Sequence, residues 1–344
     1  MKAWFVRAGR NGENEALALD EEIAVIGWSE LGDLSGIETK EALKNLIVAK
    51  HPELSTAQIG QAVAQVWAFC HDIVIGDIIA LPLKTRGVIA LGTCSGPYLY
   101  RPELTDQDAV HTRAVDWKAR DLSRTRFDED LLLSLNSGRT VGQIQSENAV
   151  PRLRALMVGD SVQLTEAEIA EANVVASSIS DLTDVPPDIE RTARDQIASL
   201  IGRRFRTYSL ESLIRSILEA RGYFVHQTRP GKDGGADLLA GRGELGFESP
   251  FLCVQVKSSS EAVGTETLQL LQAAVDDFGA SHGLLVSWGG FRESLYNKRR
   301  EKFFHIRLWD SDDIVAALLD IYDKLPEDIR AELPLKRVWI VASS

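Results

Sequence analysis

"GKDGGADLLAGRGELGFESPFLCVQVKSSS", residues 231–260, predicts two neighbouring strands with polar side chains at one end. A glycine pair allows a tight turn before the first strand, and Asp237 stands at the start of that strand. Side chains alternate between the faces of a strand, so Gln255 and Lys257 share one face of the second. Where the two strands pair, a carboxylate, an amide oxygen and an ammonium group meet.

This combination of groups indicates phosphodiester hydrolysis. Oxygen ligands suit magnesium, which keeps several waters and takes one or two carboxylates plus a substrate phosphate. Such an ion lowers the pKa of a water and offsets charge on the phosphate, while a lysine positions the nucleophile or stabilises the developing anion. Taken singly, each residue has an ordinary explanation, because aspartate is common in glycine-rich turns and lysine is common at solvated strand ends.

The segments around this stretch alternate between helices and strands. Helices are predicted over 188–205, 209–223, 264–280, 292–304 and 312–325, and strands over 223–228, 236–241, 251–257, 282–288 and 305–310. The second helix carries an apolar stripe made of Leu210, Leu213, Ile214, Ile217 and Leu218. This order predicts a mixed sheet covered by helices on both sides.

Four segments, "LESLIRSILEARGY", "DGGADLLA", "VQVKSS" and "FGASHGLLVSWGGF", resemble the Mrr-type restriction endonuclease domain of the PD-(D/E)xK nuclease superfamily. The resemblance covers about residues 205–310 and implies a restriction-endonuclease-like αβββαβ core. It implies that Asp237 binds the metal, that Gln255 replaces the usual acid, and that Lys257 is the catalytic lysine. It also implies metal contacts by the Val256 backbone carbonyl and by Glu211, the acid on the first helix.

Gln255 departs from the superfamily pattern, which often has glutamate at this position. A neutral ligand attracts a cation less strongly, and this raises the importance of Asp237 and Glu211. Asp233 is the weaker candidate for the metal-binding aspartate because it precedes the glycine turn.

Four further residues are candidates for DNA contacts. Ser258 follows the lysine, and Gln272 lies on the next predicted helix. Arg7 and Arg10 lie near the start of the chain and are candidates for phosphate contacts. The ordinary alternative for a polar side chain on such a helix or loop is contact with solvent.

The first part of the chain reads as a different domain. Strands are predicted over 3–9, 23–28, 76–83, 87–100 and 111–120, with helices over 39–52 and 55–73. Several strands with two inserted helices predict a small mixed β-barrel. The segments resemble PUA-like barrels, including the EVE and YTH relatives, which implies a pocket for a flipped or modified base. We expect Trp28, Trp67 and Tyr98 to form its walls, although aromatic residues in barrels are commonly core residues.

These patterns predict a two-domain chain that combines α+β and α/β organisation. Residues 1–145 form the PUA-like domain, residues 146–187 a helical connector that ends at a proline pair, and residues 188–344 the nuclease domain.

Composition limits the class of protein. The chain has 344 residues, 44% of them hydrophobic, and a net charge of −12, so any nucleic-acid contact must rely on local positive patches. Its three scattered cysteines fit neither a disulfide framework nor a zinc ribbon. No apolar run reaches the length of a membrane span, and the start lacks a signal peptide, so we expect a cytoplasmic protein.

The prediction for function is a magnesium-dependent endonuclease of a prokaryotic restriction or defence system, with manganese able to substitute. Its expected substrate is double-stranded DNA that carries a modified cytosine. Cutting both strands needs two active sites, which predicts a homodimer or a higher assembly. Two alternatives remain open: a catalytically inactive DNA-binding protein with the same fold, or a nuclease that acts on RNA or branched DNA.

Overall fold

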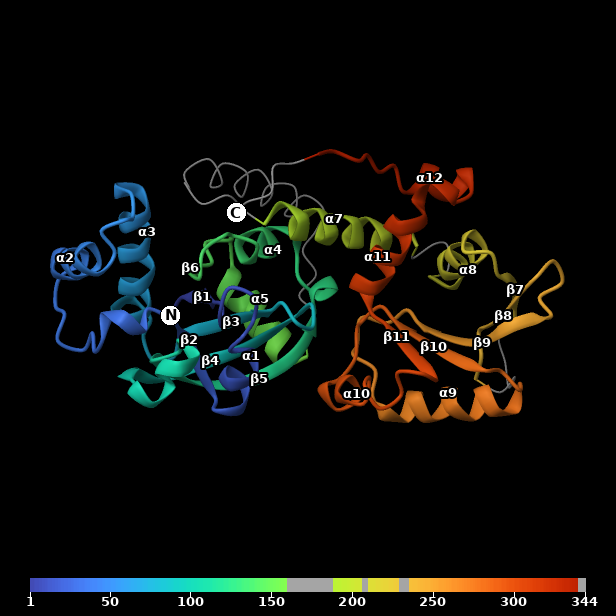
Figure 1. The fold of residues 1–344 in the computed structure, drawn as a ribbon, viewed down its shortest axis with the longest axis horizontal. Helices are drawn as coiled ribbons and strands as arrows, with labels where there is room; N and C mark the ends of the chain where they lie inside the picture. The colour runs from blue at the N-terminus through green and yellow to red at the C-terminus, as the bar shows by residue number, and fades with distance from the viewer. Residues whose placement is uncertain (160–187, 206–209, 229–234, 340–344) are drawn as a thin grey trace. The chain divides into compact units, whose positions relative to one another are not determined.

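The computed structural model describes residues 1–159, 188–205, 210–228 and 235–339 (Figure 1). The chain divides into two compact units, Met1–Thr192 and Ala193–Ser344. Each unit has its own sheet and its own buried core.

The predicted connector over 146–187 is described only in part. Residues 160–187 lie outside the described residues. Before them, helix α5 (Ala149–Met157) packs into the core of the first unit through Leu153 and Leu156. After them, the two units divide within helix α7 (Ile189–Arg204).

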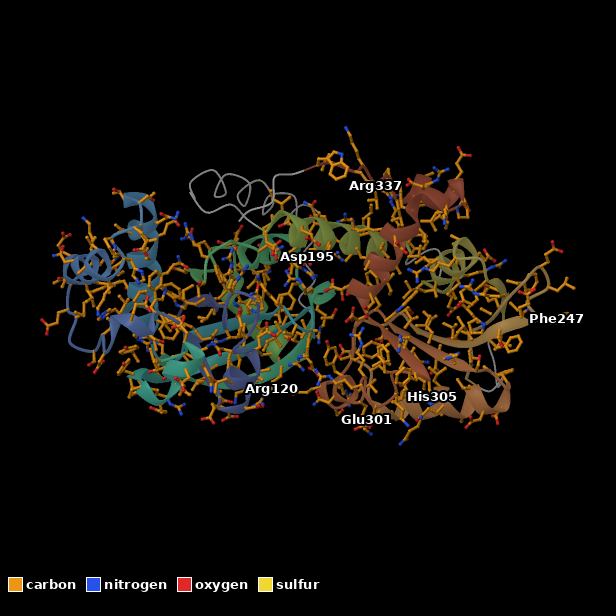
Figure 2. All side chains as sticks on the ribbon, in the orientation of Figure 1. Arg120, Asp195, Phe247, Glu301, His305 and Arg337 are labelled. Carbon is orange, nitrogen blue, oxygen red and sulfur yellow. The ribbon has the colours of Figure 1, made fainter. Side chains whose placement is uncertain are left out.

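The second unit is built on a five-stranded sheet with the order β11-β10-β9-β8-β7. Its strands are β7 (Phe224–Gln227), β8 (Leu238–Arg242), β9 (Glu248–Lys257), β10 (His282–Ser287) and β11 (Ile306–Trp309). The strands β9, β10 and β11 run parallel, whereas β7, β8 and β9 form an antiparallel meander. Figure 2 shows Phe247 at the tip of the β8–β9 hairpin, where its side chain is exposed.

Helices cover both faces of this sheet, as predicted (Figure 1). They are α7, α8 (Leu210–Ala220), α9 (Thr265–Asp277), α10 (Glu293–Asn297), α11 (Ser311–Ile321), the short η5 (Tyr322–Lys324) and α12 (Glu327–Glu332). Helices α8 and α11 pack on the face that carries Val254 and Val256. Helices α9 and α10 pack on the face that carries Cys253 and Leu285. In the described ranges, no helix is long and apolar enough to cross a membrane.

The first unit contains a six-stranded sheet with the order β2-β5-β4-β3-β1-β6. Its strands are β1 (Ala3–Val6), β2 (Ile23–Ile26), β3 (Ile78–Leu83), β4 (Val88–Tyr100), β5 (His111–Ser123) and β6 (Val141–Gln143). Its other helices include α1 (Glu15–Asp20), α2 (Lys40–Lys50), α3 (Thr56–Trp67), the short π-helix η2 (Ala68–Asp72) and α4 (Glu129–Leu135).

The predicted closed barrel is not found in the first unit. Strands β2 and β6 are the two edges of the sheet, and no pairing joins them within the described residues. The reason is that β1 and β3 are buried at every position, so both faces of the sheet need cover. One face packs with α4 and α5, and the other with α3, whereas a small barrel encloses one face only.

Candidate functional site

The predicted site residues lie at one end of the β8–β9 pair. Leu238 of β8 lies opposite Val254 of β9 in the antiparallel register. Asp237 comes directly before β8, and Gln255 and Lys257 lie at the end of β9. The structure therefore places the three residues at the same end of the β8–β9 pair.

Asp237 is fixed to β9 on both sides of Gln255. Its backbone N–H donates to the Val254 carbonyl at 2.8 Å. Its carboxylate oxygen Oδ2 accepts from the Val256 N–H at 2.6 Å. One carboxylate oxygen is thus used for positioning, and the half-buried side chain keeps a second oxygen for a ligand.

Gln255 places in the site an amide oxygen that has no partner among the described residues. The residue is only 4% exposed, and its Oε1 atom is buried and accepts no hydrogen bond from any described residue. Gly235 adopts a φ of +84°, and a Cβ atom there would lie 3.9 Å from Nε2 of Gln255. An unpartnered buried oxygen costs roughly 1–3 kcal/mol, so its presence favours a ligand that the oxygen can bind.

Lys257 ends β9 and is half-buried. Its carbonyl accepts from the Trp288 N–H at 2.8 Å, which ties the end of β9 to the loop after β10. Gln255 and Lys257 belong to the face of β9 that also carries Cys253, and this face is covered by α9. Burial, and secondarily the charge of Asp237, raise the pKa of the Cys253 thiol to about 11, so this thiol stays protonated at neutral pH.

Glu211 reaches the site region through β7. It lies on the first turn of α8, and its Oε2 accepts from Nε2 of Gln227 at 3.3 Å. Gln227 pairs with Leu238, the residue that follows Asp237. Among the described residues, no hydrogen bond joins Glu211 to Asp237, and Gln227 connects Glu211 to the strand that pairs with β8.

Two residues that sequence reasoning missed hold the turn before β8. The Thr228 N–H donates to the Asp237 carbonyl at 3.0 Å, and its Oγ1 donates to the Ala236 carbonyl at 2.6 Å. Gln227 binds Glu211 as described above. Both residues were within the predicted strand 223–228, but their roles depend on that strand pairing with β8, which spacing alone does not reveal.

The remaining predicted contacts in this unit are dispersed. Ser258 is exposed directly after Lys257. Gln272 is half-buried on α9, next to the core residue Leu271. Asp233 lies outside the described residues.

The donor set fits a hard divalent cation. Asp237 supplies a carboxylate oxygen and Gln255 an unpartnered amide oxygen. Within the described ranges, no three His, Cys, Asp or Glu side chains gather as a metal-binding group. Oxygen ligands of this kind are those that hard divalent cations prefer.

Of the three predicted base-pocket residues in the first unit, two are linked by hydrogen bonds through one histidine and the third is not part of that link. Trp28, Trp67 and Tyr98 all pack against the same core. The Tyr98 hydroxyl lies 2.8 Å from Nδ1 of His111, and Nε2 of His111 donates to the Trp28 carbonyl at 3.1 Å. Trp67 instead stacks on His71, with ring centroids 3.9 Å apart.

The two N-terminal arginines differ in placement. Arg7 points into the first unit, where Nη2 donates to the Leu135 carbonyl at 2.9 Å and burial lowers its pKa. That placement favours a structural role over the predicted phosphate contact. Arg10 is exposed, and its carbonyl accepts from Nζ of Lys84 at 2.8 Å.

Two solved structures align with much of the chain. "DNA modification-dependent restriction endonuclease AspBHI" aligns at 16% identity over 81% of this chain and 74% of that one, with a TM-score of 0.33. "MspJI Restriction Endonuclease in Complex with 27-mer Oligonucleotide" aligns at 12% identity over 87% of this chain and 70% of that one, with a TM-score of 0.31. Such TM-scores are too low for either likeness to support a conclusion about this chain.

Family comparisons are more informative. No curated protein matches the chain. Residues 4–134 match a family described as "Domain of unknown function (DUF8426)". Residues 203–318 match the Mrr catalytic family, described as "Restriction endonuclease". Because this second match runs from the end of α7 into α11 and includes the strands that position Asp237, Gln255 and Lys257, we conclude that this part of the chain is a restriction-type DNA nuclease domain of the Mrr family.

Proposed function

We propose that the chain is a magnesium-dependent endonuclease that cuts double-stranded DNA in a prokaryotic restriction or defence system. The observation that carries the proposal is the buried, unpartnered Oε1 of Gln255. Gln255 is the residue between Val254 and Val256, whose backbone groups make the two hydrogen bonds that attach Asp237 to β9. An amide oxygen that costs stability when unpartnered is expected to have a ligand in the working protein.

Each site residue has a distinct task in this proposal. Asp237 and Gln255 would hold the cation, and Glu211 would act on it through a water. The Val256 peptide positions Asp237 through its N–H, and we retain its carbonyl as a further metal ligand. Bound magnesium would lower the pKa of a water and offset charge on the scissile phosphate. Lys257 would orient the attacking water and stabilise the anion that develops on the phosphate oxygens.

We further propose that the first unit reads the DNA and favours a modified cytosine. The support is the group of half-buried aromatic residues Trp28, Trp67 and Tyr98 on one core. Aromatic faces can stack on a base that has left the duplex, and this offsets the few kcal/mol that extrusion costs. Cutting both strands would need two copies of the site, so we expect the active form to be a homodimer or larger.

The test is a cleavage assay with magnesium on plasmids that carry 5-methylcytosine, 5-hydroxymethylcytosine or unmodified cytosine. We expect cleavage of modified DNA only, absence of cleavage with EDTA, and recovery with manganese. Lys257→Ala should abolish cleavage but retain DNA binding. Equal cleavage of all three plasmids would keep the nuclease and remove the modification reader.

Failure to cut any plasmid while binding DNA tightly would favour the inactive DNA-binding alternative. Cleavage restricted to RNA or to branched DNA would favour a nuclease of the same fold with another substrate. Adding single-stranded RNA, duplex RNA and a four-way junction to the same assay separates these cases.

A further inference from the structure

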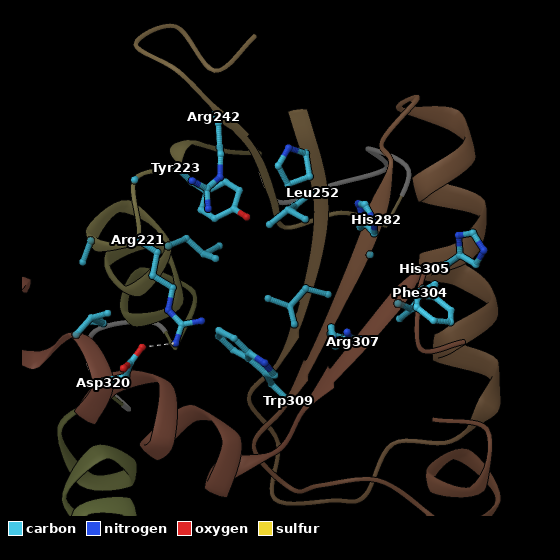
Figure 3. Close-up of a pocket in the computed structure, with 18 of the residues that line it drawn as sticks. Arg221, Tyr223, Arg242, Leu252, His282, Phe304, His305, Arg307, Trp309 and Asp320 are labelled. Carbon is cyan, nitrogen blue, oxygen red and sulfur yellow. Dashed lines mark hydrogen bonds and ion pairs between the residues drawn. The ribbon is translucent and has the colours of Figure 1, made fainter. Parts of the chain in front are cut away.

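The second unit contains a hollow that the nuclease site does not use. Its volume is about 920 Å³, within the range of small-molecule pockets. Leu252, in the middle of β9, and Leu284 of β10 line it on the side of the sheet, and the end of α8 and the chain around Tyr223 line another side. Figure 3 shows Tyr223, Leu252, His282 and Trp309 arranged around it. We call this hollow the arginine pocket.

The arginine pocket is separate from the nuclease site. Leu252 and Gln255 are three residues apart on β9, so their side chains point to opposite faces of the sheet. Leu252 packs with the core under α8 and α11, whereas Gln255 is on the face covered by α9. A ligand in the pocket would therefore not contact the metal-binding residues.

The lining of the pocket is cationic. It carries Arg221, Arg242, Arg307 and Lys324, and its single carboxylate is Asp320. The chain as a whole has a net charge of −12, so this concentration of positive charge is local. A concave cationic surface raises the local concentration of anions. The ligand should therefore be an anion.

The polar atoms of the pocket are not fully used by the protein. Nη2 of Arg221 donates to Asp320 at 3.4 Å, a long contact in which the Asp320 side chain is 72% exposed. Nε of Arg221 and Nδ1 of His282 are buried and have no hydrogen-bond partner among the described residues. Buried polar atoms in a native protein are rarely left without partners, so a ligand that reached these two atoms after a small side-chain shift would satisfy both.

The pocket also offers flat surfaces. The guanidinium carbon of Arg221 lies 5.5 Å from the centroid of the Trp309 ring, and that of Arg242 lies 5.0 Å from the Tyr223 ring. Guanidinium and aromatic planes are the surfaces on which nucleic-acid bases stack. Positive charge next to such planes suits a ligand that joins a phosphate to an aromatic base.

We propose that the arginine pocket binds a nucleotide, with its phosphate at Arg221 and Arg242 and its base beside Trp309. Two sources share this chemistry: a free nucleotide, and a nucleotide unit at the end of a DNA single strand. The site would give the nuclease domain a second nucleotide contact on the face of β9 opposite the cutting site.

The test measures ligand binding to the full chain by calorimetry in EDTA. The chain carries the Lys257→Ala substitution, so that no oligonucleotide is cut during the measurement. The probes are deoxyadenosine monophosphate, deoxyadenosine, inorganic phosphate and a four-nucleotide single strand. We expect the monophosphate to bind more tightly than either deoxyadenosine or phosphate. Tighter binding of the oligonucleotide would identify a DNA strand as the source, and equal binding would identify the free nucleotide.

Variants locate the binding. Arg221→Gln and Arg242→Gln should each weaken monophosphate binding about tenfold or more, because each removes a charge-assisted contact. Arg215→Gln is the matched control, since Arg215 lies on α8 outside the pocket and pairs with Glu219 at 2.7 Å. If either arginine variant fails to fold, Lys324→Gln replaces it as the test variant. Lys324 is exposed at the rim of the pocket, so its substitution should not disturb folding.

Either of two results would overturn the proposal. One is the absence of binding by the monophosphate and the oligonucleotide at millimolar concentration. The other is binding that the arginine and lysine variants leave unchanged. Because the assay contains no divalent cation and uses a cleavage-deficient chain, its outcome is independent of whether the nuclease proposal holds.

Discussion

The carboxylate of Asp237 accepts a hydrogen bond from the backbone N–H of Val256 at 2.6 Å, and Val256 is the residue between Gln255 and Lys257. This bond joins Asp237, directly before β8, to the end of β9, so the backbone positions of the three site residues are fixed relative to one another. A hydrogen bond to a charged acceptor is roughly twice as strong as one between neutral groups. Asp237 therefore has a structural task as well as its proposed metal-binding task, and the two can be separated.

Asp237→Asn separates them. The asparagine oxygen can still accept from the Val256 N–H, so we expect the melting temperature to change little. The cleavage rate should fall by at least about 100-fold. Replacing a residue that only hydrogen-bonds to a metal ligand commonly lowers metal affinity or activity by about 10- to 100-fold, and replacing the ligand itself should cost at least as much. A plasmid-cleavage time course checks this, with the exposed Asp276→Asn on α9 as the matched control. Unchanged cleavage by the Asp237 variant would remove it from the metal site.

Lys257→Met tests the ammonium group while keeping most of the side-chain stem. We expect kcat to fall by about 10²- to 10⁴-fold, the usual contribution of a group that transfers or orients a proton in the transition state. DNA affinity in calcium should stay within a few-fold of the original. Lys298→Met, at an exposed position after α10, is the control. A variant that lost only DNA affinity and kept kcat would show that Lys257 binds substrate without taking part in the reaction.

Gln255→Leu should make the protein more stable and inactive. The substitution removes the buried Oε1, which has no partner in the part of the chain that the structure describes, and keeps a side chain of similar width. We expect the free energy of unfolding without metal to rise by about 1 kcal/mol, because an unsatisfied buried group is removed. Urea unfolding in EDTA measures the gain, and plasmid cleavage measures the loss of activity. Reduced stability in EDTA would indicate that the oxygen already has a partner, such as a water.

Much of the second unit could be predicted from the sequence. The apolar stripe of α8 is buried at Leu210, Leu213, Ile214, Ile217 and Leu218, and the strands predicted over 236–241 and 251–257 became β8 and β9. These predictions succeeded because periodicity reports which face of an element is buried. The helix predicted over 292–304 is shorter, since α10 ends at Asn297. The helix α12 was not predicted.

The open sheet of the first unit and the contacts around Asp237 could not be predicted, because they depend on which strands pair. Hydrophobic periodicity does not show strand pairing. The barrel prediction was wrong because it rested on the number of strands and inserted helices, whereas continuous apolar runs such as β3 are buried on both faces and need cover on both. The contacts of Gln227 and Thr228 depend on β7 pairing with β8. The bond from Val256 to Asp237 joins residues 19 apart in sequence, and only the register of β8 on β9 brings them together.

Gly289→Ala tests the loops that hold the end of β9. A Cβ atom at Gly289 would lie 2.4 Å from the carbonyl oxygen of Glu261, in the segment that follows Lys257. Backbone must shift to accommodate it, so we expect a loss of about 1–3 kcal/mol in unfolding free energy and weaker cleavage. Gly60→Ala is the control, because Gly60 is exposed on α3 with open space around it and should gain about 0.5–1 kcal/mol. Equal effects of both substitutions would contradict the close approach.

The lowered pKa of His111 should make the free energy of unfolding depend on pH. Burial lowers its pKa, although the Trp28 carbonyl and the charges of Asp108, Glu30 and Asp33 oppose the shift. The folded protein therefore takes up this proton less readily than the unfolded chain, whose histidine has its ordinary pKa of 6.5. The stabilising contribution is present above about pH 6.5 and is lost as pH falls below it, by up to about 1.4 kcal/mol per pH unit.

Urea unfolding at several values between about pH 8 and pH 5 measures this slope. His111→Gln should reduce the slope, since glutamine keeps a donor and an acceptor but does not titrate. His51→Gln is a control of opposite sign. Burial opposes the shift at His51, but Glu53 and Glu30 raise its pKa, so its contribution is present at low pH and is lost as pH rises. If His111→Gln left the slope unchanged, the proton taken up on unfolding would belong to another group, and His71 on η2, whose pKa is also lowered by burial, would be the next to replace.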